Sequence, residues 1–337
     1  MTTFFMLGAQ EKLKGNKIIE LNKLINWSRC MNHLKKIHKQ DESLMGGQVA
    51  YDRLKMFKAI LLQQWHSLSD MELVEALKER ISFMAFTGFD LADEIPDAST
   101  FCRFRNKLIE RNLDERLFRE INSQIEKIGL KLEKAQCAIV DATIVESCNR
   151  PRRTTIIEND REEQEIKIEQ KESKDADARW LKKGNRFFFG YKSFATVDED
   201  GYYEKIHTTP ANIAEVNQFE ETIKNSKAKR VLADKGYASK DNREIAKKAG
   251  LKDGIMHKAQ KNKPLTNREK LINKLISKKR YVVERAFGTL KRQFGFSRAN
   301  YAGVRKVQAQ ITFKAICANL LKAVNRAIEW EYEYNCA

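Results

Sequence analysis

Hydrophobic residues recur at helical spacing between about residues 51 and 112, and this pattern predicts a series of short helices. The first has apolar residues three or four positions apart, at Leu54, Phe57, Leu61 and Trp65. Such spacing places them along one helix face. Ser67 or Ser69 is expected to cap a second helix, whose apolar positions are Leu73, Val74 and Leu77.

A third helix is predicted in the stretch PDASTFCRFRNKL, residues 96–108. Pro96 ends the preceding segment, and Ser99 is the predicted N-cap. The apolar stripe of this helix is Phe101, Phe104 and Leu108, and the basic residues off the stripe are Arg103, Arg105 and Lys107. Two interpretations stay open: a helix-turn-helix module with a basic final helix, or an ordinary helical bundle with a solvated basic face.

Near Gln136 the period changes to that of β-strands. The run CAIVDATIV, residues 137–145, is apolar and β-branched, as in a central strand. Residues 186–209 read as two strands joined by a turn at residues 198–201. A helix over 212–225, a strand ending at Asp234, a helix over 240–249, a short strand over 254–257 and a long helix after Pro264 follow. This order predicts a mixed sheet flanked by helices.

An acidic stretch separates the first strand from the two-stranded segment. Residues 157–177 contain nine acidic and four basic side chains. We expect a charged helix or a flexible excursion here, with its first half solvated.

Length and composition narrow the class of protein. A chain of 337 residues favours two domains, and 42% hydrophobic residues suffice for a core. No apolar run is long enough for a transmembrane helix, and the first residues lack the features of a signal peptide. The six cysteines form no CxxC pair, which indicates reduced thiols and a cytoplasmic location.

The net charge of +17 favours a polyanionic partner. The charge is concentrated: residues 255–306 contain 15 Lys or Arg and only two acids, Glu269 and Glu284. A block of this density is typical of a nucleic-acid-binding surface.

Two carboxylates occupy similar positions relative to the predicted core strands. Asp141 follows AIV and Asp234 follows VLA, so both are read as strand-end residues. A single strand-end aspartate is more often a cap. Two of them suggest a ligand-binding edge, because ligands of open α/β sheets gather at the carboxyl ends of strands.

Glu284 is the third candidate carboxylate. On a helix, Arg280 lies about 40° and Lys291 about 20° from it, so the three share one face. The apolar stripe of the same helix is Val283, Phe287, Leu290 and Phe294. The alternative interpretation is a solvated ion pair between Arg280 and Glu284. Three carboxylates on two strands and a helix suit two-metal phosphoryl chemistry, since Mg²⁺ prefers oxygen ligands.

At this point the sequence resembles a known family. VDATIV, LADKGY and ERAFGTLKRQFG are similar to the three carboxylate motifs of DDE-type transposases of bacterial insertion sequences, particularly the insertion-sequence-five family. GYKSF, TPAN and the segment from about residue 49 to 111 extend the resemblance over most of the chain.

The resemblance implies an α/β fold: an RNase H-like mixed-sheet catalytic domain, residues 126–337, after an N-terminal all-helical domain that binds DNA, residues 1–125. It implies Asp141, Asp234 and Glu284 as catalytic and metal-binding residues, with Mg²⁺ as cofactor and Mn²⁺ as a substitute. The implied reaction nicks element ends and joins the freed 3′-hydroxyl to target DNA. The implied partners are double-stranded DNA, at terminal inverted repeats and target sites, and a second copy of the chain in a dimer; no membrane is involved.

Eight cations are expected to contact DNA: Arg280, Lys291, Lys278, Lys279, Arg285, Arg292, Arg103 and Arg105. Since Arg103 and Arg105 lie about 200° apart on a helix, one is expected at DNA and the other solvated or paired. The related insertion-sequence-four signature has a tyrosine where this chain has Ser277. Two alternatives remain: a metal-dependent nuclease without strand transfer, and a DNA-binding regulator without catalysis.

Overall fold

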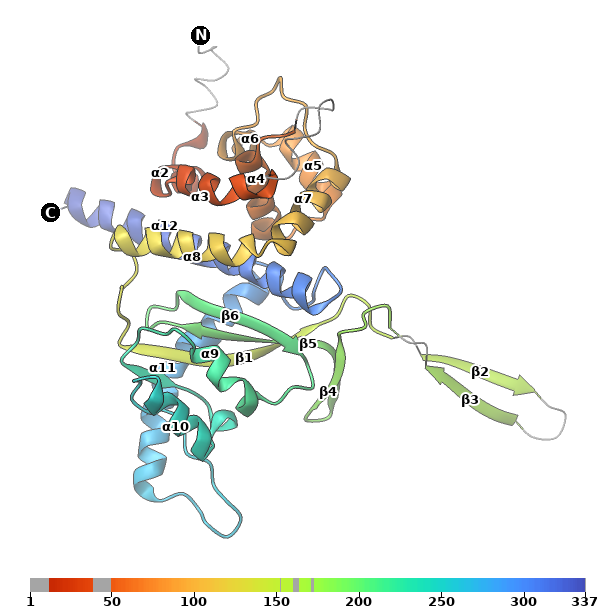
Figure 1. The fold of residues 1–337 in the computed structure, drawn as a ribbon, viewed down its shortest axis with the longest axis vertical. Helices are drawn as coiled ribbons and strands as arrows, with labels where there is room; N and C mark the ends of the chain where they lie inside the picture. The colour runs from red at the N-terminus through yellow and green to blue at the C-terminus, as the bar shows by residue number, and fades with distance from the viewer. Residues whose placement is uncertain (1–11, 39–49, 152, 160–163, 171–172, 337) are drawn as a thin grey trace.

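The computed structural model describes residues 12–38, 50–151, 153–159, 164–170 and 173–336. Helices in the N-terminal part precede a mixed β-sheet, and a long C-terminal helix runs back to them (Figure 1). The predicted mixed α/β class is therefore confirmed. The first eleven residues, on which the expectation about a signal peptide rests, lie outside the described residues.

The N-terminal helices form where the apolar periodicity predicts them, with further helices on either side. They are α2 (Lys17–Leu24), α3 (Trp27–Leu34), α4 (Arg53–His66), α5 (Asp70–Glu79), α6 (Ile81–Thr87), α7 (Ala98–Glu110) and α8 (Leu113–Lys127). Ser69 caps α5 in a reciprocal capping box with Glu72. The N-cap of α7 is Asp97 and not Ser99, because the Asp97 carboxylate accepts from the amide of Thr100.

The central sheet is mixed. Its strands are β1 (Cys137–Glu146), β4 (Arg179–Lys183), β5 (Arg186–Val197), β6 (Tyr203–Pro210) and β7 (Arg230–Leu232). β5 pairs antiparallel with β1, β4 and β6, whereas β7 pairs parallel with β1. The predicted turn between β5 and β6 is confirmed, since the amide of Gly201 donates to the carbonyl of Asp198.

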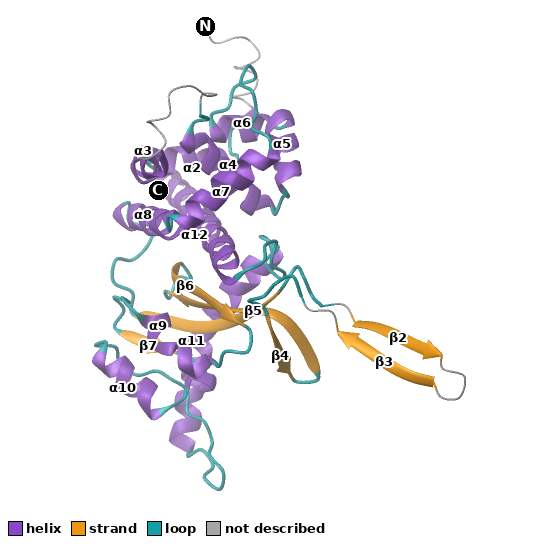
Figure 2. Cartoon of the chain, turned by 45° about the vertical axis from the view of Figure 1, so that its right-hand side comes forward, coloured by secondary structure: helices purple, strands orange, loops and turns teal. Residues whose placement is uncertain are grey.

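Both faces of the sheet are covered, because apolar side chains of β1 alternate between them. Cys137 and Ile139 belong to the core that includes α11 (Asn267–Arg292) and α12 (Val304–Cys336). Ala138 and Val140 belong to a second core, which includes residues of α9 (Phe219–Ile223) and α10 (Lys240–Lys248). Figure 2 shows these helices around the strands.

Three predictions about this region are corrected. β1 does not end at Asp141 but continues for five residues, in register with β5 up to Glu146. The helix predicted over residues 212–225 is reduced to a 3₁₀ turn, η2 (Glu215–Gln218), and the short α9. The strand predicted over residues 254–257 is only an isolated parallel bridge between Ala233 and Ile255.

Where it is described, the acidic stretch forms strands, so the charged helix expected as one alternative is wrong. β2 (Arg153–Asn159) and β3 (Gln164–Gln170) pair antiparallel as a separate two-stranded sheet, which projects from the rest of the chain (Figures 1 and 2). Residues 160–163 and 171–172 of the stretch lie outside the described residues.

The C-terminal helix α12 packs against both the N-terminal helices and the central sheet. It packs against α2, α4, α8 and β6, and most side chains of its first two-thirds are buried. The buried ammonium of Lys314 donates to the carbonyls of Gln64 and Phe294, which ties the end of α4 to the segment after α11. None of the described helices combines the length and apolar character that a membrane span requires.

Candidate active site

The pairing of β1 with β7 places Asp141 beside Asp234. The two strands are parallel, with Ile139 opposite Leu232. Asp141 and Asp234 each follow this pair by two residues in the sequence, Asp141 within β1 and Asp234 just after β7. Adjacent strands lie about 4.8 Å apart, so the register alone brings the two carboxylates to neighbouring positions.

Arg280 of α11 binds both carboxylates. Its Nη2 lies 3.3 Å from Oδ1 of Asp141, and its Nη1 lies 3.8 Å from Oδ1 of Asp234. Asp141 shares the strand face of Cys137 and Ile139, which α11 covers. Arg280 is 7% exposed. The expectation that Arg280 holds DNA phosphates is therefore corrected: its guanidinium is committed to the two aspartates.

The surroundings of Asp141 carry an excess of negative charge. Burial raises the pKa of Asp141 to about 6; Arg280 opposes this shift, and the carboxylates of Glu215 and Asp234 add to it. Glu215, which sequence analysis missed, stands in η2 and lies 3.7 Å from Nζ of Lys192. Lys192 belongs to the GYKSF motif, which was the only sequence signal for this corner of the site.

Tyr237 of the LADKGY motif lies at the buried side of this cluster, whose carboxylates are half-buried. Its hydroxyl is buried and has no hydrogen-bond partner among the described residues. Burial raises the pKa of Tyr237 well above its usual value, and the charges of Glu215, Asp141 and Asp234 raise it further. Gly236 next to it leaves room for Glu215, since a Cβ at that position would lie 2.9 Å from Oε2 of Glu215 and the carboxylate would have to shift.

Glu284 is not brought into this cluster. It lies one helical turn after Arg280 on α11, and its side chain is exposed. Within the ranges that the structure describes, no three Asp, Glu, His or Cys side chains are arranged to hold a metal ion. The structure thus assembles two of the three expected carboxylates, and the role of Glu284 stays a prediction.

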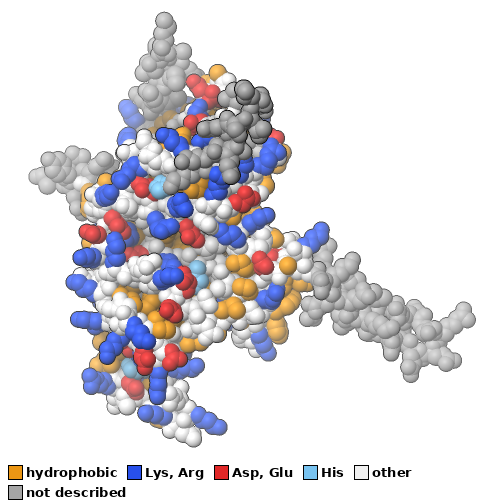
Figure 3. All heavy atoms as spheres, in the orientation of Figure 1, with side chains coloured by type: hydrophobic (Ala, Val, Ile, Leu, Met, Phe, Trp, Pro, Cys, Tyr) orange, Lys and Arg blue, Asp and Glu red, His pale blue; other side chains and the backbone are white. Residues whose placement is uncertain are grey.

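Most of the other cations of α11 that are expected to contact DNA lie on its solvent-facing side. Lys278, Lys279, Arg285 and Arg292 are exposed. Lys291 is half-buried, and burial together with the charge of Lys183 lowers its pKa. The ring of Tyr281 is 55% exposed and lies 5.6 Å beneath the guanidinium of Arg285. Figure 3 shows lysine and arginine side chains around α10 and α11, at the lower end of the view.

The two arginines of α7 differ sharply in environment. Arg105 is 4% exposed and binds Asp70 through both terminal nitrogens, at 2.6 and 2.9 Å. Arg103 is exposed and hydrogen-bonds to Thr100. Arg105 is the paired member that the helical geometry anticipated. Its expected DNA contact is corrected, because the guanidinium stacks 4.5 Å from the Tyr301 ring inside the protein.

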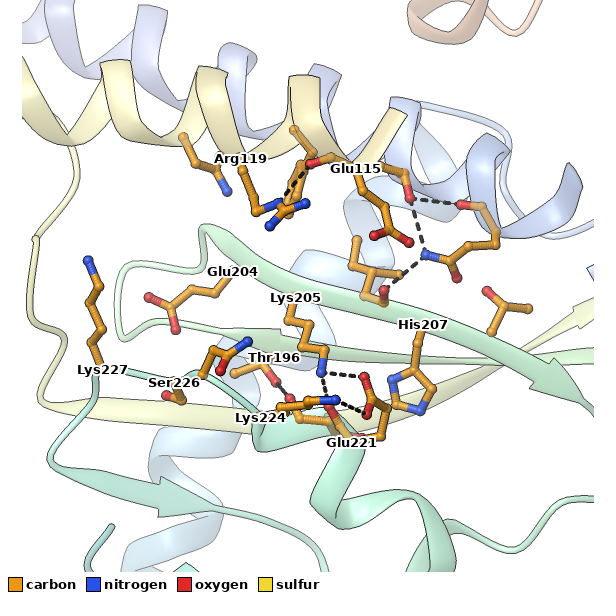
Figure 4. Close-up of a pocket in the computed structure, with 18 of the residues that line it drawn as sticks. Glu115, Arg119, Thr196, Glu204, Lys205, His207, Glu221, Lys224, Ser226 and Lys227 are labelled. Carbon is orange, nitrogen blue, oxygen red and sulfur yellow. Dashed lines mark hydrogen bonds and ion pairs between the residues drawn. The ribbon is translucent and has the colours of Figure 1, made fainter. Parts of the chain in front are cut away.

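A cavity of about 680 Å³ lies elsewhere, between α8, β6 and the α9 region (Figure 4). Some of its charged side chains are paired within the wall: Lys205 and Lys224 both contact Glu221. Burial lowers the pKa of His207, another lining residue, to about 4. The lining contains none of the three expected carboxylates.

Comparison with known families identifies the chain. Residues 133–320, which include Asp141, Asp234 and Glu284, match the Transposase DDE domain, and residues 5–107 match the Transposase domain (DUF772). The chain therefore belongs to the DDE transposases of insertion sequences, a family of enzymes of DNA transposition.

One curated relative is the transposase for insertion sequence element IS1106 of Neisseria meningitidis serogroup B. It is 46% identical over 227 residues, which cover 67% of this chain and 78% of the relative. No solved structure matches the chain.

DDE transposase domains depend on divalent metal ions, and the aspartate cluster fits such an ion. Asp141 and Asp234 supply the hard oxygen donors that these cations prefer. The charges of Glu215, Asp141 and Asp234 all act on the Tyr237 hydroxyl, and among the described residues Arg280 opposes them. A bound divalent cation would offset this excess of negative charge.

Proposed function

We propose that this enzyme nicks DNA at the ends of an insertion sequence and joins the freed 3′-hydroxyl to target DNA, with Mg²⁺ as the metal. Its place in the insertion-sequence-five family is part of the proposal. The observation that carries it is the parallel register that sets Asp141 beside Asp234, with Arg280 between them.

We further propose that the catalytic part has an RNase H-like core, residues 126–337. The support is the order of its strands, in which β6, β5 and β1 are antiparallel neighbours and β7 joins β1 in parallel. The bridge from Ala233 to Ile255 extends this parallel side. Asp141 lies on the first strand of this arrangement, and Asp234 follows the strand next to it.

In this proposal Asp141 and Asp234 hold the metal, and Glu284 completes the donor set when DNA is bound. Catalytic contacts are often loose before substrate binds, which is compatible with the exposed position of Glu284. Bound divalent cations supply activation of the attacking oxygen and stabilisation of the leaving oxygen. Arg280 is a positioning residue here, because it fixes both aspartates from within the protein.

The DNA-binding surfaces proposed are the N-terminal helices, residues 1–125, for the element ends, and the exposed face of α11 for the phosphates beside the aspartates. Lys278, Lys279, Arg285 and Arg292 are exposed there. A dimer on DNA is also proposed, since two element ends have to be processed.

The test is a joining assay with purified protein, Mg²⁺, labelled duplex carrying the terminal inverted repeat, and a supercoiled target plasmid. Wild-type protein is expected to give both nicked ends and joined product. Glu284→Gln is expected to abolish both, whereas Glu244→Gln, at an exposed carboxylate of α10, should retain them. Nicking without joining would identify a nuclease. Binding without either reaction would identify a DNA-binding regulator.

A further inference from the structure

β4 and the first part of β5 form a two-stranded ribbon that continues beyond the end of β1. The last residue of β1 that pairs with β5 is Glu146, opposite Gly190, whereas β4 pairs with residues 186–190. A two-residue turn joins the ribbon strands, with Gly184 at a φ of +60°, as in tight hairpin turns that place glycine first. In Figures 1 and 2 this β4–β5 ribbon extends away from the N-terminal helices.

The ribbon is strongly basic. Residues 178–194 contain five Lys or Arg and no acidic residue. Lys182, Lys183 and Arg186 are exposed around the turn. Lys183 and Arg186 stand directly opposite each other across the two strands, and like charges in that position destabilise a hairpin. The folded chain thus maintains a repulsion that a polyanion would relieve.

An exposed aromatic ring accompanies these cations. Phe187 is 56% exposed, opposite Lys182, whose Nζ lies 5.5 Å from the ring centre. Figure 3 shows hydrophobic side chains next to lysine and arginine side chains at this place. Basic and apolar side chains together are typical of elements that enter a DNA groove.

The ribbon is firmly attached to the catalytic part. Phe189 at its base is buried, with its ring 5.2 Å from that of Trp180, and its carbonyl accepts from the amide of Ser147. Arg298, which follows α11, donates to the carbonyls of Ser147 and Cys148. The base of the ribbon is therefore fixed to the end of β1 and to the segment after α11.

The charge at the tip of the ribbon has the same sign as the exposed charge on α11. The charge of Lys183 acts on Lys291 of α11 and contributes to the lowered pKa of that lysine. Lys183 thereby continues the basic face of α11 onto the ribbon.

We infer that the β4–β5 ribbon is a second DNA-binding element, which inserts its tip into a groove of duplex DNA. Lys182, Lys183 and Arg186 contact phosphates, and Phe187 supplies an apolar contact within the groove. A two-stranded ribbon fits the major groove of B-form DNA. The inference rests on the proposed function for the identity of the partner, but it concerns binding and not catalysis.

The test measures duplex binding by fluorescence anisotropy across a series of salt concentrations, in buffer without divalent metal. Replacing Lys182, Lys183 and Arg186 together by Gln is expected to weaken binding about 10- to 100-fold and to reduce the slope of log K against log salt by about 2.7, since each lost phosphate contact removes about 0.9. Lys183→Gln alone should reduce the slope by about 0.9. Phe187→Ala should weaken binding with an unchanged slope, because an apolar contact in the groove releases no counterion.

The matched control replaces Lys134, Lys227 and Lys229 by Gln. These three lysines are exposed and lie before the first residues of β1 and β7, at the other end of β1 from the ribbon. This variant should bind with wild-type slope and affinity. Unchanged slopes in both ribbon variants, or equal losses in the control, would overturn the ribbon as a DNA contact while leaving the proposed function intact. Wild-type protein that binds no duplex would contradict the proposed function itself.

Discussion

The guanidinium of Arg280 on α11 lies 3.3 Å from the carboxylate of Asp141 on β1, where the helix packs against the strand. The helical spacing of four residues suggested a pair between Arg280 and Glu284 instead. The tertiary contact prevails because Arg280 lies on the buried side of α11 and Glu284 on its exposed side. The arginine thus organises the aspartates and leaves Glu284 accessible from solvent.

Replacing Arg280 by Met is expected to lower the free energy of unfolding by about 3 kcal/mol, because it leaves two adjacent carboxylates without their shared cation. The measurement is urea denaturation in buffer with a chelator. Arg292→Met, at an exposed position of the same helix, serves as the control and should change stability by less than about 0.5 kcal/mol. Equal stability of the two variants would show that Arg280 does not hold the aspartates.

The arginines of α7 should separate stability from DNA binding. Arg105→Ala is expected to cost about 3 kcal/mol, because it leaves the half-buried carboxylate of Asp70 without its partner. Arg103→Ala should leave the thermal midpoint unchanged and weaken binding to the element ends. Thermal melts and end-binding titrations of both variants provide the comparison. A stable Arg105→Ala protein with impaired binding would reverse the two assignments.

Neutralising Lys278, Lys279, Arg285 and Arg292 together should weaken DNA binding on every sequence tested. The slope of log K against log salt is expected to fall by about 3.6, at about 0.9 for each phosphate contact. Titrations of element-end DNA and of unrelated duplex at several salt concentrations measure this change. Loss confined to the element-end sequence would mean that these side chains read bases.

Asp198, in the turn between β5 and β6, should make stability depend on pH. Burial raises the pKa of Asp198 to about 7 from an ordinary value of 3.8, so the folded chain favours its protonated form. Its contribution to stability is complete below about pH 4 and is lost as the pH rises through 7. Asp198→Asn retains an acceptor for the amide of Tyr202.

The difference in thermal midpoint between Asp198→Asn and wild-type protein should therefore increase in favour of the variant from pH 4 to pH 8. Asp241→Asn, at an exposed position of α10, should show no such trend. A constant difference across this range for Asp198→Asn would indicate that the carboxyl titrates normally in the folded chain.

Sequence patterns predicted the elements whose side chains pack within their own neighbourhood. α4, α7 and α11 follow from apolar stripes, and the β5–β6 hairpin follows from its turn residues. The strand over residues 137–145 was predicted, but the reading of Asp141 as its end was wrong, because β1 continues through this residue. The partner of Arg280 could not be predicted, since it depends on how α11 lies across β1.

α12 shows why a long buried helix escaped prediction. Gln308, Lys314 and Asn319 interrupt its apolar pattern, yet all three are buried. Gln308 donates to the carbonyl of Ile206, and Asn319 to that of Tyr203. These partners lie more than 100 residues away in sequence. Polar residues whose partners are so distant read as solvent-facing positions until the fold is known.

Asp234 provides the most direct test of the central claim that the aspartates hold the catalytic metal. Its carboxylate also caps the 3₁₀ turn η3 (Lys235–Tyr237) by accepting from the amide of Lys235. Asn and Asp are nearly equivalent as caps, so Asp234→Asn retains the cap and removes the charge that binds a hard cation. The variant should therefore fold normally and still bind DNA.

The decisive measurement is Mg²⁺-dependent nicking of labelled element-end DNA by Asp234→Asn protein, with a thermal melt and a DNA-binding titration on the same preparation. We predict a wild-type thermal midpoint, DNA binding at least as tight as that of wild-type protein, and nicking reduced by at least about 1,000-fold, as expected when a metal ligand is lost. Near-normal nicking by the folded variant would contradict the account and leave Asp234 as a turn cap.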